Sequence, residues 1–310
     1  MPIADRLFTN GSFHTLDPSR PDGPPADALA SWRGRIVAVG SQAEVDALVG
    51  PDTEVVDLDG STVLPGFIET HMHPIGAGLM MSAAQIGYPA CHDIDGVVSA
   101  LAARADMTPT GEPIQTWGYD DSLMDDDRHL TRDDLNRAST EHPILVRHIS
   151  GHLSYANDRT LELAGIADDV EDPVGGVFQR EASGRPNGCM EETAGFAIAA
   201  ALPQTTLADM AAGAHAISDH CLSVGTTTMT DAAIGSPTMY AAYQQGVEDG
   251  SIRVRTRMFP IWRTAGDLPF RTGIGDERLS IGAMKFISDG SIQGYTACLC
   301  KGNHDRPDVN

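Results

Sequence analysis

One stretch of the sequence, from Thr62 to His73, limits the possible folds more than any other. It opens with the apolar run Thr-Val-Leu-Pro-Gly-Phe-Ile and closes with the polar residues Glu-Thr-His-Met-His. A buried parallel strand has this pattern when its C-terminal end opens onto a site, because the strand is covered on both faces and only its end is free. The stretch therefore predicts a strand of a parallel α/β sheet with functional groups at its end.

The two histidines at the end of this stretch, His71 and His73, are candidate metal ligands. Residues two apart on a strand project from the same face, so both imidazoles can bind one divalent cation from one side. Glu69 adds a polar group to that face. A His-x-His pair also occurs by chance in loops, and it is the apolar run before it and Pro74 after it that favour a metal site.

The rest of the chain alternates short strands with helices, which is typical of an α/β fold. Residues 1–61 have the pattern of short strands and tight turns, with turns at Asn10-Gly11 and Arg33-Gly34, and we expect them to form the N-terminal part of a β-sandwich. The spacing of apolar residues predicts helices over 96–105, capped by Asp93 or Asp95, and 207–222, and strands over 113–119, 143–148, 225–231, 252–262 and 279–287.

Composition excludes several classes of protein. Lys and Arg total 21 against 43 Asp and Glu, a formal charge of −22. A field of that sign repels nucleic acid and anionic membrane, so we expect neither as a partner. The five cysteines are odd in number and scattered, which argues against a disulfide framework and for the reducing cytoplasm. The N-terminal residues lack the apolar run of a signal peptide, and Gly195 to Leu202 is too short to span a bilayer.

Lys285 is the second residue that points to chemistry. It is flanked by Gly282, Ala283, Met284 and Phe286 in a predicted apolar strand. Burying an unpaired ammonium is costly, so we expect the amine to be paired or chemically changed. A carboxylate such as Asp289 is one partner that would satisfy it.

These segments together resemble the amidohydrolase superfamily. Leu64 to Pro74 is similar to its metal-binding signature, in which Asp or Glu precedes the His-x-His pair. Other segments resemble the branch that contains N-substituted formamide deformylases: Trp117 to Asp120, Ser150 to His152, Gly188 to Ala194, and Met284 to Phe286. The resemblance implies a metal-dependent hydrolase with a TIM-type barrel.

The resemblance also implies roles for individual residues. His71 and His73 would bind a divalent metal, with zinc expected, and Lys285 would be carboxylated by carbon dioxide so that its carbamate bridges two ions. Asp120, His152 and Glu192 would line the substrate pocket. Ordinary structural roles are the alternative for Asp120 and His152, and capping a helix is the alternative for Glu192.

Strand order in the superfamily gives a domain division. It places the His-x-His pair on the first barrel strand and the lysine on the fourth, and the strands at Phe67, Thr227, Arg253 and Lys285 match that count. We therefore expect a partial TIM-type (β/α) barrel of four strands, divided into an N-terminal sandwich part (1–61), the first barrel strand (62–89), an α+β insertion that lines the substrate pocket (90–220) and barrel strands two to four (221–310).

Four strands cannot close a barrel. We expect the 310 residues to be a truncated portion of a longer protein, or to be completed by a second chain or by another copy, and to be inactive alone. The general base and two further histidine ligands implied by the resemblance would lie beyond residue 310, and His304 is not assigned as a ligand.

The resemblance therefore implies hydrolysis of a C–N bond, amide-like or formamide-like, in a small-molecule substrate by metal-activated water. Two alternatives remain open. One is a deaminase of the same superfamily with a single metal, and the other is a non-catalytic half-barrel that serves as a binding module.

Overall fold

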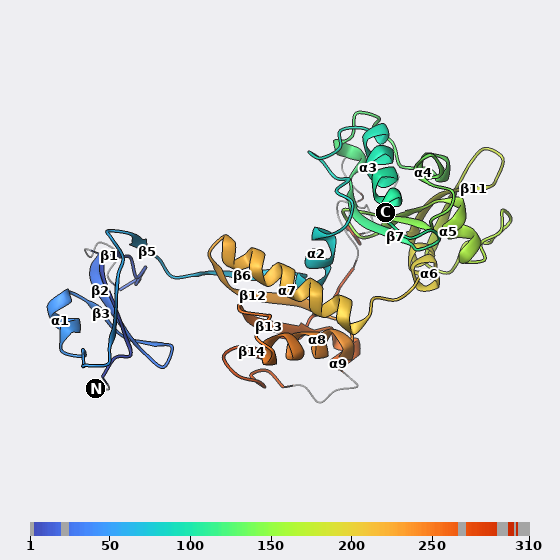
Figure 1. Cartoon of the computed structure of the whole chain (residues 1–310). Coiled ribbons are helices and arrows are strands. Elements are labelled where there is room, and N and C mark those ends of the chain that lie inside the picture. The colour runs from blue at the N-terminus through green and yellow to red at the C-terminus, as the bar shows by residue number, and fades with distance from the viewer. Residues whose placement is uncertain (1–2, 20–24, 266–270, 290–296, 301, 303–310) are drawn as a thin grey trace. The chain divides into compact units, whose positions relative to one another are not determined.

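The structure, a computed structural model, describes residues 3–19, 25–265, 271–289, 297–300 and 302 (Figure 1). His304 lies outside the described residues. The chain divides into two compact units, Met1–Ile68 with Gly225–Thr227, and Glu69–Val224 with Thr228–Asn310. The first unit is mainly strands with one short helix, and the second unit mixes helices and strands throughout, so the predicted mixed α/β class is confirmed.

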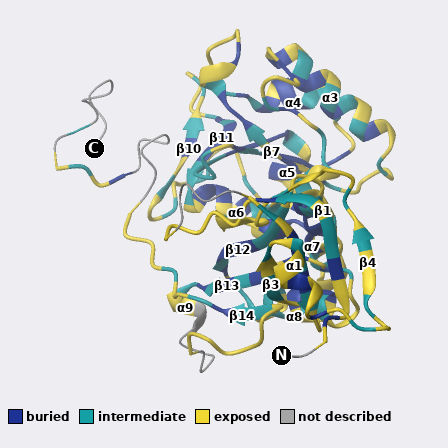
Figure 2. Ribbon diagram, turned by 90° about the vertical axis from the view of Figure 1, so that its left-hand side faces the viewer, coloured by how far each residue is buried: buried dark blue, intermediate teal, exposed yellow. Residues whose placement is uncertain are grey.

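The first unit is built on one five-stranded sheet. Four strands have the order β3-β2-β1-β4, and β5 pairs with β1. Its elements are β1 (Arg6–Phe13), β2 (Ala26–Trp32), β3 (Arg35–Gly40), α1 (Gln42–Asp46), β4 (Glu54–Asp57) and β5 (Thr62–Val63). Leu7, Ala28, Ala30 and Val45 form its buried core under α1. The last strand of the order, β4, is largely exposed (Figure 2).

The two turns expected in this unit have different outcomes. Arg33 and Gly34 both have positive φ (51° and 74°) and join β2 to β3, so the predicted hairpin is confirmed. The prediction at Asn10-Gly11 is wrong. Asn10 has a φ of 54° but lies inside β1, where the pairing with β2 shifts between Thr9 and Phe13. β1 advances four residues over this shift while β2 advances two, and the two extra residues are accommodated as a bulge because β1 remains paired on both sides of them.

A four-stranded sheet in the order β14-β13-β12-β6 carries the His-x-His segment. Its strands are β6 (Phe67–Met72), β12 (Thr226–Ile234), β13 (Arg255–Pro260) and β14 (Leu279–Ile281), and the helices beside them are α2 (Pro74–Met81), α7 (Leu207–Ser223), α8 (Pro237–Glu248) and α9 (Trp262–Ala265). Met229, Met258 and Ile281 pack against α2, α7 and α8 in one core, so one face of the sheet is covered by helices (Figure 1).

The last predicted strand is shorter than expected. The sequence predicts a strand over 279–287, but β14 ends at Ile281, and only an isolated bridge between Lys285 and Ile261 continues the pairing. An apolar run fixes neither the length of a strand nor its partner, because pairing depends on the neighbouring strand.

Residues 94–201 form a second five-stranded sheet with helices on both faces, in the order β10-β11-β9-β8-β7. Its elements are α3 (Ile94–Asp106), β7 (Ile114–Tyr119), η1 (Asp121–Leu123), α4 (Arg132–Ala138), β8 (Ile144–His148), β9 (Leu153–Ala156), α5 (Asp158–Leu163), β10 (Gly176–Arg180), β11 (Pro186–Glu192) and α6 (Thr193–Ala201). The Asp93 side chain accepts from the Gly96 amide, which confirms the predicted cap.

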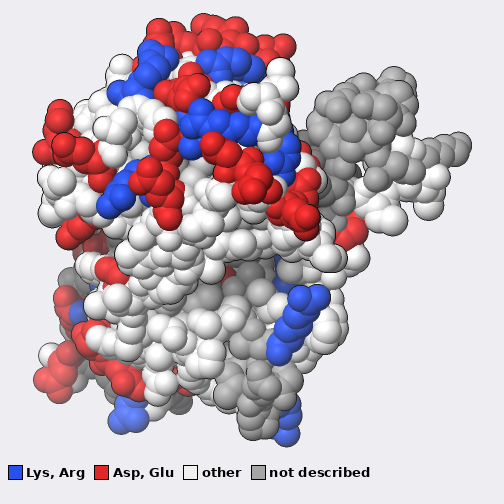
Figure 3. Space-filling model, turned by 90° about the vertical axis from the view of Figure 1, so that its right-hand side faces the viewer, with Lys and Arg blue, Asp and Glu red and all other residues white. Residues whose placement is uncertain are grey.

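Alternation along β8 explains the two layers of helices. Ile144 and Val146 pack on the α3 and α4 side, whereas Leu145 between them packs with α5 and α6. Both faces of the strand are therefore apolar. Acidic and basic side chains are interspersed over the upper part of the face shown in Figure 3. Ion pairs of the described residues include Arg128–Asp134 and Arg180–Asp172.

Candidate functional site

His71 and His73 lie side by side at the end of β6. Met72 between them packs into the core under the helices, so alternation turns both histidines away from that core. Their ring centroids are 5.9 Å apart and the rings are nearly perpendicular. Glu69 fixes the backbone here, because its Oε1 accepts the His71 amide at 2.9 Å. Pro74, the first residue of α2, ends the strand directly after His73.

A buried carboxylate that the sequence analysis missed lies next to His73. Asp231 of β12 is fully buried, and its Oδ1 is 3.7 Å from His73 Nδ1. The Tyr243 hydroxyl of α8 donates to Oδ2 at 2.7 Å, and the Ala233 amide donates to Oδ1 at 3.0 Å. Burial, reinforced by the Asp231 charge, raises the pKa of Tyr243 well above its usual value, so the phenol remains a donor.

Lys285 lies at the end of β13, in the same sheet. Its amide donates to the Pro260 carbonyl at 2.8 Å and its carbonyl accepts from the Trp262 amide at 3.0 Å. The apolar strand predicted around Lys285 is not buried: Lys285 is half-buried, and its neighbours Met284 and Phe286 are exposed. Asp289, the partner proposed from sequence, instead accepts the Cys298 amide at 3.0 Å.

These groups lie at one edge of the sheet. The Phe67 amide donates to the Gly225 carbonyl where β6 and β12 begin, and His73 meets Asp231 toward the end of both strands, so the two strands run the same way. β12, β13 and β14 are parallel to one another. The C-terminal edge of a parallel sheet is where α/β proteins place their active sites.

His152 and Glu192, which the sequence assigned to a substrate pocket, form a pair. His152 Nδ1 is 2.8 Å from Glu192 Oε1, and the Glu192 amide donates to the His152 carbonyl at 2.9 Å. Glu192 occupies the N-cap position of α6, but its side chain makes no capping hydrogen bond. Its carboxylate is used to hold the imidazole instead.

Asp120 belongs to a network of acids and histidines on β7, η1 and β8. Its carboxylate accepts from the Ser122 amide and hydroxyl. The neighbouring Asp121 bonds His148 Nε2 at 3.1 Å and lies 3.3 Å from His129 Nδ1. Hydrogen bonds from these two imidazoles, His129 first, hold the pKa of Asp121 far below its usual value.

The same network could hold a metal ion. One ligand atom from each of Asp120, Asp121 and His148 lies within 4.8 Å of the others. In the structure these atoms are engaged with one another and with Ser122 and Ser150, so a cation there would replace existing hydrogen bonds. The sequence motifs point to Asp120 but not to Asp121 or His148, and the one local signal for Asp121 is its position next to Asp120.

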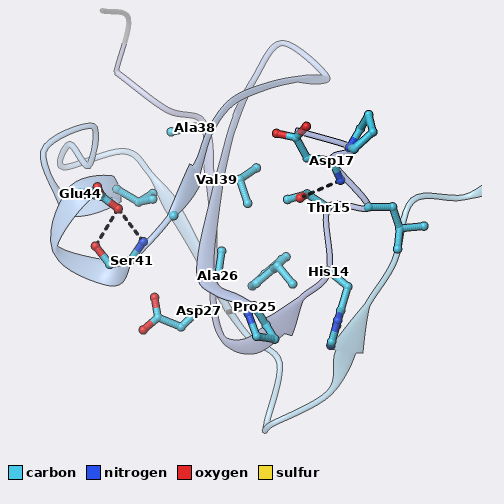
Figure 4. Close-up of a pocket in the computed structure, with 15 residues that line it drawn as sticks. His14, Thr15, Asp17, Pro25, Ala26, Asp27, Ala38, Val39, Ser41 and Glu44 are labelled. Carbon is cyan, nitrogen blue, oxygen red and sulfur yellow. Dashed lines mark hydrogen bonds between the residues drawn. The ribbon is translucent and has the colours of Figure 1, made fainter. Parts of the chain in front are cut away.

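The first unit contains a hollow of about 940 Å³ (Figure 4). Its lining includes His14, Asp17, Asp27 and Glu44 around apolar residues such as Val39. Figure 4 shows Glu44 turned to Ser41, whose amide and hydroxyl both donate to it at 2.8 Å. None of the predicted site residues lines this hollow, so it is not the candidate centre.

Residues 54–308 match the model of the Amidohydrolase family, and the chain belongs to that family. It is 28% identical to Protein LONG AFTER FAR-RED 3 of Arabidopsis thaliana, over 98% of this chain and 54% of that protein. It is 27% identical to the Putative amidohydrolase YtcJ of Bacillus subtilis, over 93% of this chain and 55% of that protein. It is 30% identical to the N-substituted formamide deformylase of Arthrobacter pascens, over 62% of this chain and 35% of that protein. The chain thus spans about half the length of the first two relatives.

Solved structures show the same fold. An uncharacterized metal-dependent hydrolase from Pyrococcus horikoshii superposes with a TM-score of 0.73 at 19% identity, covering 96% of this chain and 57% of that one. A second, from Pyrococcus furiosus, gives a TM-score of 0.70 at 18% identity, covering 98% of this chain and 60% of that one.

Of the helices in the described ranges, none combines the length and apolarity needed to cross a bilayer.

Proposed function

We propose that this chain forms part of a metal-dependent enzyme that hydrolyses a C–N bond, amide-like or formamide-like, in a small molecule. The observation that carries the proposal is the placement of His71 and His73 side by side at the C-terminal edge of a parallel sheet. Membership of the amidohydrolase family and the likeness to metal-dependent hydrolases support the reaction class. The formamide deformylase among the relatives supports the C–N bond.

The residues at this edge have the donor chemistry that a divalent cation requires. Two imidazoles facing away from the helix-side core suit zinc or a similar ion, and a buried carboxylate lies behind one of them. In the proposal Lys285 supplies a third ligand as a carbamate, formed when its neutral amine adds to carbon dioxide and loses a proton. The end-of-strand position of Lys285 supports this role, since it reaches the same edge of the sheet.

When bound, the metal would lower the pKa of its water ligand and polarise the substrate carbonyl. The residues of this chain perform the other tasks. His71 and His73 fix the position of the ion, and Glu69 holds the backbone that carries them. Asp120, His152 and Glu192 would select the substrate, and the fixed His152–Glu192 pair supports that role.

The proposal extends to the architecture and the location of the enzyme. A TIM-type barrel has eight strands, so the four-stranded sheet would be completed by strands outside it. Three of the cysteines are buried thiols without a disulfide, which supports a reducing cytoplasm.

Metal analysis of the intact enzyme tests the proposal. The double variant His71→Ala/His73→Ala should lose the bound zinc. Its rate of hydrolysis of an N-substituted formamide, measured by the release of formate, should fall at least about a hundredfold. Lys285→Ala should lower the metal content per chain. The matched control is His215→Ala, an exposed histidine on α7 bonded to the Ser251 carbonyl, which should keep both metal and activity.

Three other results would redirect the assignment. Retention of metal in the His71/His73 variant and its loss in His148→Ala would move the metal to the Asp120–Asp121–His148 group. A single metal that is unaffected by Lys285→Ala would favour a one-metal deaminase of the same family. An intact protein that binds no metal and hydrolyses nothing would favour a binding module.

A further inference from the structure

The buried carboxylate of Asp231 has no cationic side chain to offset its charge. Its side chain is 1% exposed, and within the described part of the chain no Lys or Arg forms an ion pair with it. Burying a carboxylate in this way is costly unless hydrogen bonds or a charge compensate for it. Tyr243 and Ala233 supply two hydrogen bonds, and the ionisable group that faces the remaining side is His73.

His73 needs an external partner if its ring is to keep one orientation. Its side chain is 57% exposed, so packing does not fix the imidazole. Its neighbour His71 touches it only edge to face. A histidine that binds a metal through one ring nitrogen commonly donates its other N–H to a carboxylate, which fixes both the tautomer and the ring plane.

The carboxylate that faces His73 is held firmly. Tyr243 lies on α8, and its hydroxyl oxygen also accepts from the backbone amide of Ile75, two residues after His73. The buried cluster of Asp231, Tyr243 and the Ile75 backbone therefore ties β12, α8 and the start of α2 together beneath the imidazole. An acceptor with two other hydrogen bonds cannot rotate away from His73 without losing them.

We propose that Asp231 is a positioning residue that accepts the Nδ1–H of His73 and so leaves Nε2 free to bind the metal. This inference rests on the proposed metal site at His71 and His73. The present separation of 3.7 Å is longer than a hydrogen bond, so the proposal requires the exposed ring to move closer to Asp231 when the metal binds. Asp231 then acts on the metal only through His73.

Zinc affinity in the intact enzyme, measured by competition with a chelating dye, tests the role. Asp231→Asn should weaken zinc binding about 10- to 100-fold, the range typical for loss of a partner of a metal-ligating histidine. Tyr243→Phe should weaken it less, because the carboxylate remains. The control is Asp134→Asn, another buried carboxylate, paired with Arg128, which should leave zinc affinity unchanged.

Thermal unfolding of the metal-free proteins separates positioning from structure. If Asp231→Asn unfolds at a lower temperature but binds zinc as tightly as the wild type, the proposal is wrong. If His73→Ala leaves zinc binding intact, the proposed metal site at His71 and His73 is itself wrong. If His73→Ala abolishes binding and Asp231→Asn does not change it, only the present inference fails.

A spectroscopic measurement on the wild type covers the case in which Asp231→Asn does not fold. In zinc-loaded enzyme with ¹⁵N-labelled histidine, long-range proton–nitrogen correlations report which ring nitrogen carries a proton. We expect a protonated Nδ1 and a metal-bound Nε2 for His73. A metal-bound Nδ1 would overturn the inference.

Discussion

Glu192 has a backbone conformation that side chains rarely adopt. Its φ and ψ are 48° and −120°, and such positions cost about 1–3 kcal/mol when the residue is not glycine. The conformation persists because the amide and the carboxylate of Glu192 both bond His152. Strained residues of this kind cluster at functional sites, which agrees with the substrate-pocket role proposed for the pair.

Glu192→Gly tests whether this strain serves function. Glycine adopts positive φ without penalty, so relief of strain should offset the lost hydrogen bond, and the free energy of unfolding should change by less than about 1 kcal/mol. Activity should nevertheless fall, with kcat/KM reduced at least about tenfold because His152 is no longer held. Urea unfolding and steady-state kinetics measure the two quantities.

The control for this prediction is Asp127→Gly. Asp127 has nearly the same φ, 47°, in the turn after η1, so it gains the same backbone freedom without touching the His152–Glu192 pair. It should keep full activity. Equal activity in Glu192→Gly and the wild type would show that the strained conformation has only a structural role.

At the scale of elements, α2 and α7 pack closely because glycines meet between them. A Cβ added at Gly78 would lie 1.8 Å from the Gly213 carbonyl oxygen, and one added at Gly213 would lie 2.8 Å from the Ile75 carbonyl oxygen. No side chain fits between the two backbones. Since α2 begins directly after His73, this contact also affects the position of the segment that carries the proposed metal ligands.

Gly78→Ala should therefore destabilise the protein despite the better helix propensity of alanine. Overpacking costs about 1–3 kcal/mol, against about 1 kcal/mol gained from propensity. Zinc affinity should fall as well, because α2 must shift. Gly76→Ala on the same helix is the matched control: its Cβ would meet nothing within 4 Å, so it should raise stability by about 0.5–1 kcal/mol. Equal stability of the two variants would contradict this account.

The elements that sequence predicted well are those with local signals. The helix after Asp93 has its cap and its apolar spacing within a few residues, and the Arg33-Gly34 hairpin is fixed by two adjacent left-handed residues. The end of β14 and the bulge at Asn10 were missed, because they depend on partner strands. Asp231 was missed for the same reason: only folding brings β12 beside His73.

At the scale of the whole molecule, the four-stranded sheet and the five-stranded sheet of residues 94–201 have separate cores. Met229, Met258 and Ile281 pack with α2, α7 and α8, whereas β8 divides two other clusters between its faces. A ligand stabilises the part of a protein that must open for the ligand to be lost. The core whose amides become more protected from hydrogen exchange when the metal binds therefore shows where the metal lies.

Hydrogen exchange of the intact enzyme, measured with zinc bound and again after chelation, identifies that core. With the metal on His71 and His73, chelation should speed exchange in peptides from β6, α2 and β12 and leave β8 and β11 unchanged, since those strands belong to the other sheet. At zinc concentrations a hundredfold above the dissociation constant, the protection lost corresponds to about 2.7 kcal/mol. Faster exchange in β7 and β8 alone would place the ion at Asp120, Asp121 and His148. The location of the metal is thus decided by an observable that requires neither a known substrate nor a substitution.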